Sequence, residues 1–122
     1  MKLHLAQFAG QNAFTGYGAG YVLVNGERFE RSLIVLPDRL ITDWTPRTSA
    51  ELTEADLAFL ATLAVDIVLL GTGARLCFPP PGLAQTLPRQ GIGLEVMDSQ
   101  AAARTYNILL AEGRRVAAAV ML

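Results

Sequence analysis

The second half of the chain alternates strand-like and helix-like segments, and this order constrains the fold more than any other feature. Apolar runs at 66–71, 92–98 and 114–122 predict strands, while the segments between them, 80–91 and 99–113, predict helices. Two strands joined by a helical crossover pair in parallel, and the crossover is nearly always right-handed. The sequence therefore predicts a parallel βαβαβ unit with three strands.

Both crossover helices carry signals for where they begin and end. The second begins with Asp98 or Ser99 as its N-cap and ends at Gly113, which suits a left-handed C-terminal residue. Its inner face is predicted to carry Ala102, Tyr106 and Leu109. The first helix contains Pro88, which would remove a backbone hydrogen bond and clash with the preceding turn. We therefore expect that helix to kink or to end before Pro88.

The first third of the chain has the pattern of antiparallel strands. Asn25 and Gly26 separate two strand-like segments, 21–24 and 27–30, and Asn-Gly is the strongest short signal for a type I′ hairpin. The glycine-rich segment before them, 14–20, is interpreted as an irregular entry to the hairpin. A strand over 3–8 is also expected.

A second pair of strands is predicted after the hairpin. The continuous apolar run 33–36 is typical of a strand that is covered on both faces. Pro37 and Asp38 supply a turn, and a further short strand is expected over 40–44.

The clearest helix of the sequence is predicted over 53–64. Its apolar residues recur at helical spacing, so that one face is apolar. Thr53 is the predicted N-cap, and Asp56 stands at the third helical position, as in a weaker form of the capping box. One domain spanning 1–122 is the simplest organisation: an α/β (α+β) fold in which an antiparallel hairpin portion packs against the βαβαβ portion.

Composition excludes several classes of function. The formal net charge is −1, and the arginines are dispersed, so no nucleic-acid partner is expected. No apolar run approaches the roughly 20 residues that cross a bilayer, so no membrane insertion is expected. The first residues lack the pattern of a secretory signal or a transit peptide, which favours a cytoplasmic location.

Catalytic and metal-binding arrangements are hard to assemble from these residues. The chain has one histidine, His4, in the predicted opening strand, and one cysteine, Cys77, between two apolar neighbours, where a buried structural thiol is expected. These two residues give neither a catalytic triad nor a ligand cluster for zinc. We expect no catalytic residues, no metal, no cofactor and no enzymatic activity.

A candidate ligand site follows the first predicted parallel strand. Gly71, Thr72 and Gly73 stand where α/β proteins place phosphate sites, and Arg75 could neutralise an anion. Asp98 ends the neighbouring strand, as an acidic residue does in dinucleotide folds. The glycine spacing does not match a complete dinucleotide or P-loop motif. The alternative interpretation is a tight turn at 71–73 and simple helix capping by Asp98.

A candidate protein interface lies at the end of the strand over 40–44. Trp44 and the nearby Arg47 are residue types that anchor protein interfaces. Trp44 has two open interpretations, as an exposed anchor or as a seal on the edge of the core.

Several stretches of the chain resemble one small domain family of unknown function. They are SLIVLPDRLITDW at 32–44, LTEADL before the first helix, IVLLGTG at 67–73, GIGLEVMD at 91–98 and AAARTYNILLAEGRRVAAAV at 101–120. The family that this chain resembles includes the mitochondrial complex I assembly factor 3 and the adipogenesis-associated single-domain protein. The resemblance implies a three-layer β/β/α fold and no shared catalytic residues.

The resemblance also supplies the leading functional expectation. It implies a non-enzymatic accessory or assembly-type protein that acts by binding another protein, as a monomer or a homodimer. The alternative is a small-molecule or anion-binding protein, or an enzyme, with its site at the Gly71–Gly73 loop.

Overall fold

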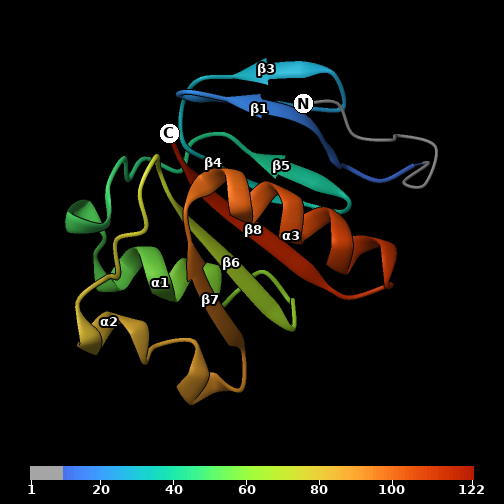
Figure 1. Ribbon diagram of the computed structural model, residues 1–122. Coiled ribbons are helices and arrows are strands. Elements are labelled where there is room, and N and C mark those ends of the chain that lie inside the picture. The colour runs from blue at the N-terminus through green and yellow to red at the C-terminus, as the bar shows by residue number, and fades with distance from the viewer. Residues whose placement is uncertain (1–9) are drawn as a thin grey trace.

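The three predicted parallel strands are neighbours in a five-stranded sheet in the computed structural model, which describes residues 10–122 (Figure 1). β6 (Ile67–Thr72) pairs in parallel with both β7 (Gly93–Met97) and β8 (Val116–Met121). The βαβαβ prediction is therefore confirmed. The predicted strand over 3–8 and His4 lie outside the described residues.

The second pair of strands extends the same sheet. β4 (Leu33–Leu36) is buried along its whole length, as expected, and turns through Pro37 and Asp38 into β5 (Arg39–Ile41). β4 also pairs antiparallel with β8, which gives the order β5-β4-β8-β6-β7. The five-stranded sheet is therefore mixed, with β5 and β7 at its two edges.

A separate antiparallel sheet contains β1 (Phe14–Gly18), β2 (Tyr21–Val24) and β3 (Glu27–Phe29). The predicted Asn-Gly hairpin is confirmed, because Asn25 and Gly26 both have positive φ, at 52° and 85°. The interpretation of 14–20 as irregular was wrong for 14–18, which form β1, while Ala19 and Gly20 form the turn to β2. Pairing with β2 supplies the hydrogen bonds that make 14–18 a strand, and Gly18 leaves room for the Tyr21 ring, with which a Cβ would overlap.

The helices begin where the capping signals predicted, and the first is shorter than expected. α1 (Glu54–Leu60) has the complete capping box between Thr53 and Asp56. It ends before the predicted boundary at 64, and Ala64 adopts a left-handed φ of 60° where the chain turns toward β6. α3 (Ser99–Ala111) has Asp98 as its N-cap.

The first crossover contains only short helical pieces, because Pro88 divides it as predicted. α2 (Pro81–Ala84) ends before that proline, and a 3₁₀ turn, η3 (Pro88–Gln90), follows. A second 3₁₀ turn, η2 (Ser49–Glu51), precedes α1.

The five-stranded sheet has a hydrophobic cluster on each face. One cluster joins the sheet to α3 and the three-stranded sheet, and the other joins it to α1, Trp44 and Leu87. Three layers result, in agreement with the expected β/β/α arrangement, and α3 shares its layer with the small sheet (Figure 1). Ala102 and Tyr106 of α3 are buried, and Leu109 packs partly buried against the same cluster.

Candidate functional site

The Gly71–Gly73 loop is built for close packing between β6 and α3. A Cβ on Gly71 would lie 2.9 Å from Oγ of Ser99, 3.0 Å from its Cα and 3.2 Å from Cβ of Ala102. Such distances are below ordinary van der Waals contact, so only glycine allows the start of α3 to approach the strand this closely. The glycine at 71 therefore has a packing reason.

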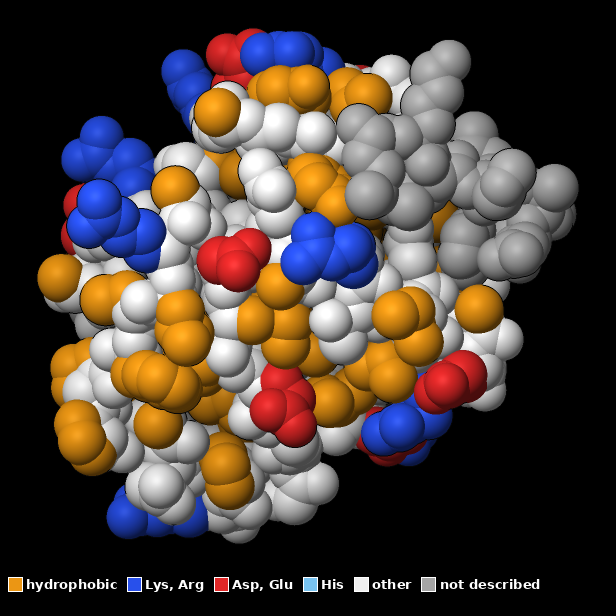
Figure 2. Space-filling model, viewed as in Figure 1, with side chains coloured by type: hydrophobic (Ala, Val, Ile, Leu, Met, Phe, Trp, Pro, Cys, Tyr) orange, Lys and Arg blue, Asp and Glu red, His pale blue; other side chains and the backbone are white. Residues whose placement is uncertain are grey.

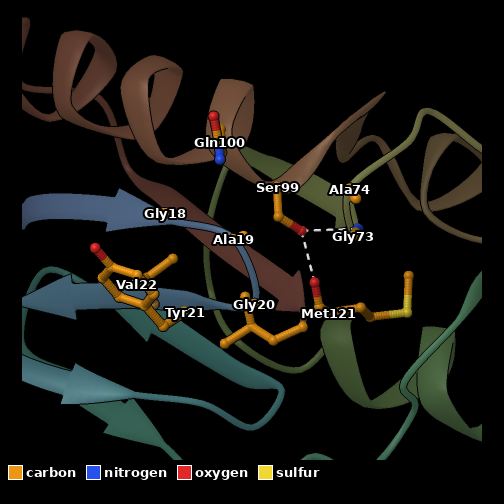
Figure 3. A pocket seen from close by; sticks show the side chains of 11 residues that line it. Gly18, Ala19, Gly20, Tyr21, Val22, Gly73, Ala74, Ser99, Gln100 and Met121 are labelled. Carbon is orange, nitrogen blue, oxygen red and sulfur yellow. Dashed lines mark hydrogen bonds between the residues drawn. The ribbon is translucent and has the colours of Figure 1, made fainter. Parts of the chain in front are cut away.

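Ser99 joins three segments at the carboxyl end of the sheet. Its hydroxyl accepts a hydrogen bond from the Gly73 N–H (2.8 Å) and donates to the Met121 carbonyl (2.7 Å), as the dashed lines in Figure 3 mark. The Ser99 N–H also donates to the Gly73 carbonyl (2.9 Å). Ser99 is 4% exposed, so these bonds are shielded from water. The Gly73 N–H, which an anion would need, is already used.

The Thr72 hydroxyl is also occupied inside the protein. It donates to the Arg75 carbonyl (2.6 Å), lies 3.3 Å from the Met97 carbonyl and accepts from the Cys77 N–H (3.0 Å). This one side chain closes the tight loop over 72–77. The positive φ of Gly73, 91°, completes the turn.

Asp98 and Arg75 do not meet at a ligand site. The Asp98 carboxylate accepts from the Ala101 N–H (2.9 Å), so it performs the capping role that was the alternative interpretation. The Arg75 side chain is exposed and forms no ion pair within residues 10–122.

A small hollow of about 160 Å³ lies next to Gly73 (Figure 3). Its lining comes from the β1–β2 turn, the Gly73 loop, the start of α3 and the end of β8: Gly18, Ala19, Gly20, Tyr21, Val22, Gly73, Ala74, Ser99, Gln100, Met121 and Leu122. Of the five predicted ligand residues, only Gly73 lines it. Sequence reasoning missed Gln100 and the β1–β2 turn, because their approach to Gly73 depends on how the two sheets pack.

Cys77 is exposed, which corrects the expectation of a buried thiol. Its backbone is held on both sides, because its N–H donates to Thr72 and its carbonyl accepts from the Ser49 hydroxyl (2.5 Å). The side chains of both of its neighbours are also exposed. Leu76 is 53% exposed and Phe78 is 69% exposed. Figure 2 shows hydrophobic side chains gathered at the left of the molecule, over the loop that leads into α2.

The two predicted interface residues differ in burial: Trp44 is buried and Arg47 is exposed. Trp44 is only 6% exposed and packs in the cluster with α1, so its side chain seals the core and is not an exposed anchor. Its indole N–H is the one buried side-chain polar group without a hydrogen-bond partner in the described residues. Arg47 is exposed, and its guanidinium lies 3.6 Å from the Glu51 carboxylate.

Asp66 and Tyr106 have shifted pKa values, and both side chains form hydrogen bonds within the protein. A hydrogen bond from Arg115 lowers the pKa of the exposed Asp66 carboxyl, and burial raises the pKa of Tyr106, whose hydroxyl donates to the Asn12 carbonyl (2.8 Å). Within residues 10–122, no three His, Cys, Asp or Glu side chains come together to hold a metal ion. In the same range, no helix is long and apolar enough to span a bilayer.

Sequence comparisons identify relatives over most of the chain. The model of the family described as "Protein of unknown function (DUF498/DUF598)" matches residues 14–121. An uncharacterised protein of Rhodobacter capsulatus is 38% identical over 93% of this chain and 87% of its own length. The bovine NADH dehydrogenase [ubiquinone] 1 alpha subcomplex assembly factor 3 is 30% identical over 86% of this chain. The match spans 58% of that assembly factor.

Solved structures share the fold. A crystal structure from Bordetella parapertussis is 41% identical, with a TM-score of 0.86, and the match covers 93% of this chain and 97% of that one. A solution structure from Bordetella pertussis, described as a Mth938-like domain, is 34% identical with a TM-score of 0.78 and covers 99% and 92% of the two chains. Both support the mixed α/β architecture with two sheets.

Proposed function

The chain belongs to the family described as proteins of unknown function (DUF498/DUF598), and from this membership and the surface around Phe78 we propose that it is an accessory or assembly-type protein that binds another protein. Relatives named as assembly factors support the assembly-type role. The proposal includes a non-enzymatic mode of action in the cytoplasm. Partner binding is its central statement.

The observation that carries this proposal is the exposed apolar pair Leu76 and Phe78. Side chains of this kind gain roughly 1.5–3 kcal/mol each when they leave water, and aromatic residues dominate the energy of many interfaces. The pair stands on a backbone fixed by both hydrogen bonds of Cys77, and three prolines, Pro79, Pro80 and Pro81, follow. A fixed backbone lowers the entropy lost on binding.

Variants of this pair test the proposal directly. The tagged protein, the Leu76→Ser/Phe78→Ser double variant and an Ile108→Ser variant are expressed in the native cell and recovered with their bound proteins. Ile108 is 59% exposed on α3 and serves as a matched apolar control. We expect a specific partner with the wild type and the control, and its loss with the double variant. Equal recovery by all three proteins, or no enriched partner, would refute the proposal.

A second candidate function is the binding of a small molecule in the hollow beside Gly73. Its volume of about 160 Å³ is below the usual ligand-site range of roughly 300–1,000 Å³, so a nucleotide does not fit inside it. A compact apolar molecule suits the lining better than an anion, because the hydroxyl of Ser99 and the Gly73 N–H are already paired.

Ligand binding in the hollow would raise thermal stability by mass action. A thermal-shift screen of small apolar compounds, phosphate and short carboxylates should therefore find a stabilising compound. Ala19→Leu, a change at the exposed rim of the hollow, should remove the shift. A flat screen, or a shift that survives Ala19→Leu, would reject this second function.

A further inference from the structure

The segment after β5 leaves the five-stranded sheet and joins neither sheet. Residues 42–48 belong to no strand or helix, and exposed and buried residues alternate over 43–47 as in a half-buried strand. Trp44 and Pro46 are buried, while Asp43, Thr45 and Arg47 are exposed. Over 43–47 the chain is therefore held against the core by Trp44 and Pro46, and its other side faces solvent.

The backbone of this segment is free to pair. Within the described residues, no N–H or C=O group of 42–46 forms a hydrogen bond to another backbone group, and the Arg47 N–H donates to the Glu51 carboxylate (3.0 Å). The segment prolongs β5, which is an edge strand of the five-stranded sheet. An exposed edge of this kind is a template for pairing with a strand from another chain.

A larger hollow borders the segment on the side of the small sheet. It has a volume of about 680 Å³, and both Arg31 and Arg47 line it. Glu30, in the same lining, is bound to Arg28 at 2.6 Å, whereas Arg31 has no ion-pair partner within residues 10–122. Asp43 also lines it and has no ion-pair partner in the same residues. We call this the basic hollow after its two arginines, of which Arg31 is unpaired.

A smaller hollow borders the segment on the side of α1. Its volume is about 180 Å³, and its lining includes the carboxylates of Asp43 and Asp56 beside the ring of Phe59. Asp43 and Thr45 line both hollows, so this segment is the wall between them. We call this second space the acidic hollow.

From this arrangement we propose that residues 42–46 bind an extended segment of a partner protein by backbone pairing along the β5 edge. Successive side chains of a strand point to opposite faces. An acidic side chain of the partner enters the basic hollow toward Arg31, and the adjacent basic side chain enters the acidic hollow toward Asp43. This mode combines main-chain hydrogen bonds with side-chain pockets, as other strand-addition sites do.

The inference rests on the proposed function and states where the partner's chain lies. The Ser49 hydroxyl at η2 donates to the Cys77 carbonyl, so the chain that follows the edge is joined to the loop of Leu76 and Phe78. Figure 1 shows the chain leading into η2 and the loop after β6 on the same side of the molecule. A partner that covers Phe78 can therefore reach the edge with the same polypeptide.

Trp44 makes the binding measurable. It is the single tryptophan of the chain and lines both hollows, so its fluorescence reports directly on this edge. The probe is the capped hexapeptide Thr-Val-Glu-Lys-Val-Thr, whose central residues carry the two required charges. The control peptide has the same sequence with N-methylated glutamate and lysine, which removes backbone donors and leaves both charges unchanged.

We expect a saturable fluorescence change with the probe and none with the N-methylated peptide. Arg31→Glu should weaken the affinity for the probe peptide about tenfold. Arg89 is an exposed arginine of η3, and Arg89→Glu should leave that affinity unchanged. Thermal unfolding of each variant confirms that the fold is intact. Absence of a saturable change, equal binding of both peptides, or equal effects of the two charge reversals would overturn the inference.

The same variants separate this inference from the proposed function. If Arg31→Glu still recovers the native partner while the Leu76→Ser/Phe78→Ser variant does not, the partner binds without the edge. Partner binding then stands and the edge pairing is rejected. Loss of the partner in both variants, with recovery by Arg89→Glu, is the result that the inference predicts.

Discussion

Replacing Gly71 by alanine tests whether the glycine of this loop is required for packing. The added methyl group would lie 2.9 Å from Oγ of Ser99 and 3.0 Å from its Cα. Because the second of these atoms belongs to the backbone, a rotamer change cannot relieve the contact. The start of α3 has to move away from β6, and this movement strains the bonds from Ser99 to Gly73 and Met121.

The size of the effect follows from two opposing contributions. Overpacking a well-filled site costs ~1–3 kcal/mol of unfolding free energy. Alanine lowers the entropy of the unfolded chain relative to glycine, which returns ~0.4–1 kcal/mol. The net expectation is a loss of about 1–2 kcal/mol, which corresponds to a melting temperature lower by roughly 3–10 °C for a chain of this size.

Urea unfolding followed by circular dichroism measures this difference. Gly82→Ala is the matched control, because no atom lies within 4 Å of a Cβ at this position and it stands in the first turn of α2. We expect Gly82→Ala to leave stability unchanged or slightly raised. If Gly71→Ala were as stable as Gly82→Ala, the packing explanation for the loop would be wrong.

Three further predictions concern the groups that fix the small sheet and α3. Asn107→Leu should cost ~2–5 kcal/mol in urea unfolding, because Asn107 bonds both the N–H (3.0 Å) and the C=O (2.7 Å) of the buried Phe14, which would lose both partners. Asp98→Ala should cost ~1 kcal/mol through loss of the helix cap, and Asp98→Asn should restore most of it. Burial raises the pKa of Tyr106 above its unfolded value. The contribution of the protonated Tyr106 hydroxyl to folding stability is therefore fully present below pH ~10 and is lost as the pH rises above it. Tyr106→Phe should therefore lose less stability than the wild type between pH 8 and 11; an equal loss would contradict the role of Tyr106.

Local sequence signals predicted the elements of this fold well where the backbone preference of a single residue determines the structure. The Asn25-Gly26 hairpin, the cap at Thr53 and the break at Pro88 each follow from a backbone preference of the residue itself. The strand over 14–18 was missed because its stability comes from β2 and from Asn107, which is 93 residues away from Phe14. Likewise, the pairing of β4 with β8 joins segments that no local pattern connects.

The candidate site was only partly predictable for the same reason. The loop after β6 was located correctly, but the sequence did not tell whether its donors face a ligand or another part of the chain. The structure pairs them with Ser99 and with the backbone of 75–77. The exposure of Cys77 was also missed, because apolar neighbours indicate burial only when the backbone permits it. Here the two bonds of its main chain hold the loop at the surface.

Photo-crosslinking in the native cell tests the central claim, partner binding at the exposed loop, most directly. Benzoylphenylalanine is placed at Phe78 in one strain and at Ile108 in another, since both positions are exposed and apolar. Binding through the loop predicts a discrete adduct with one other protein from position 78 and none from position 108. No adduct at position 78, or the same adducts from both positions, would contradict it.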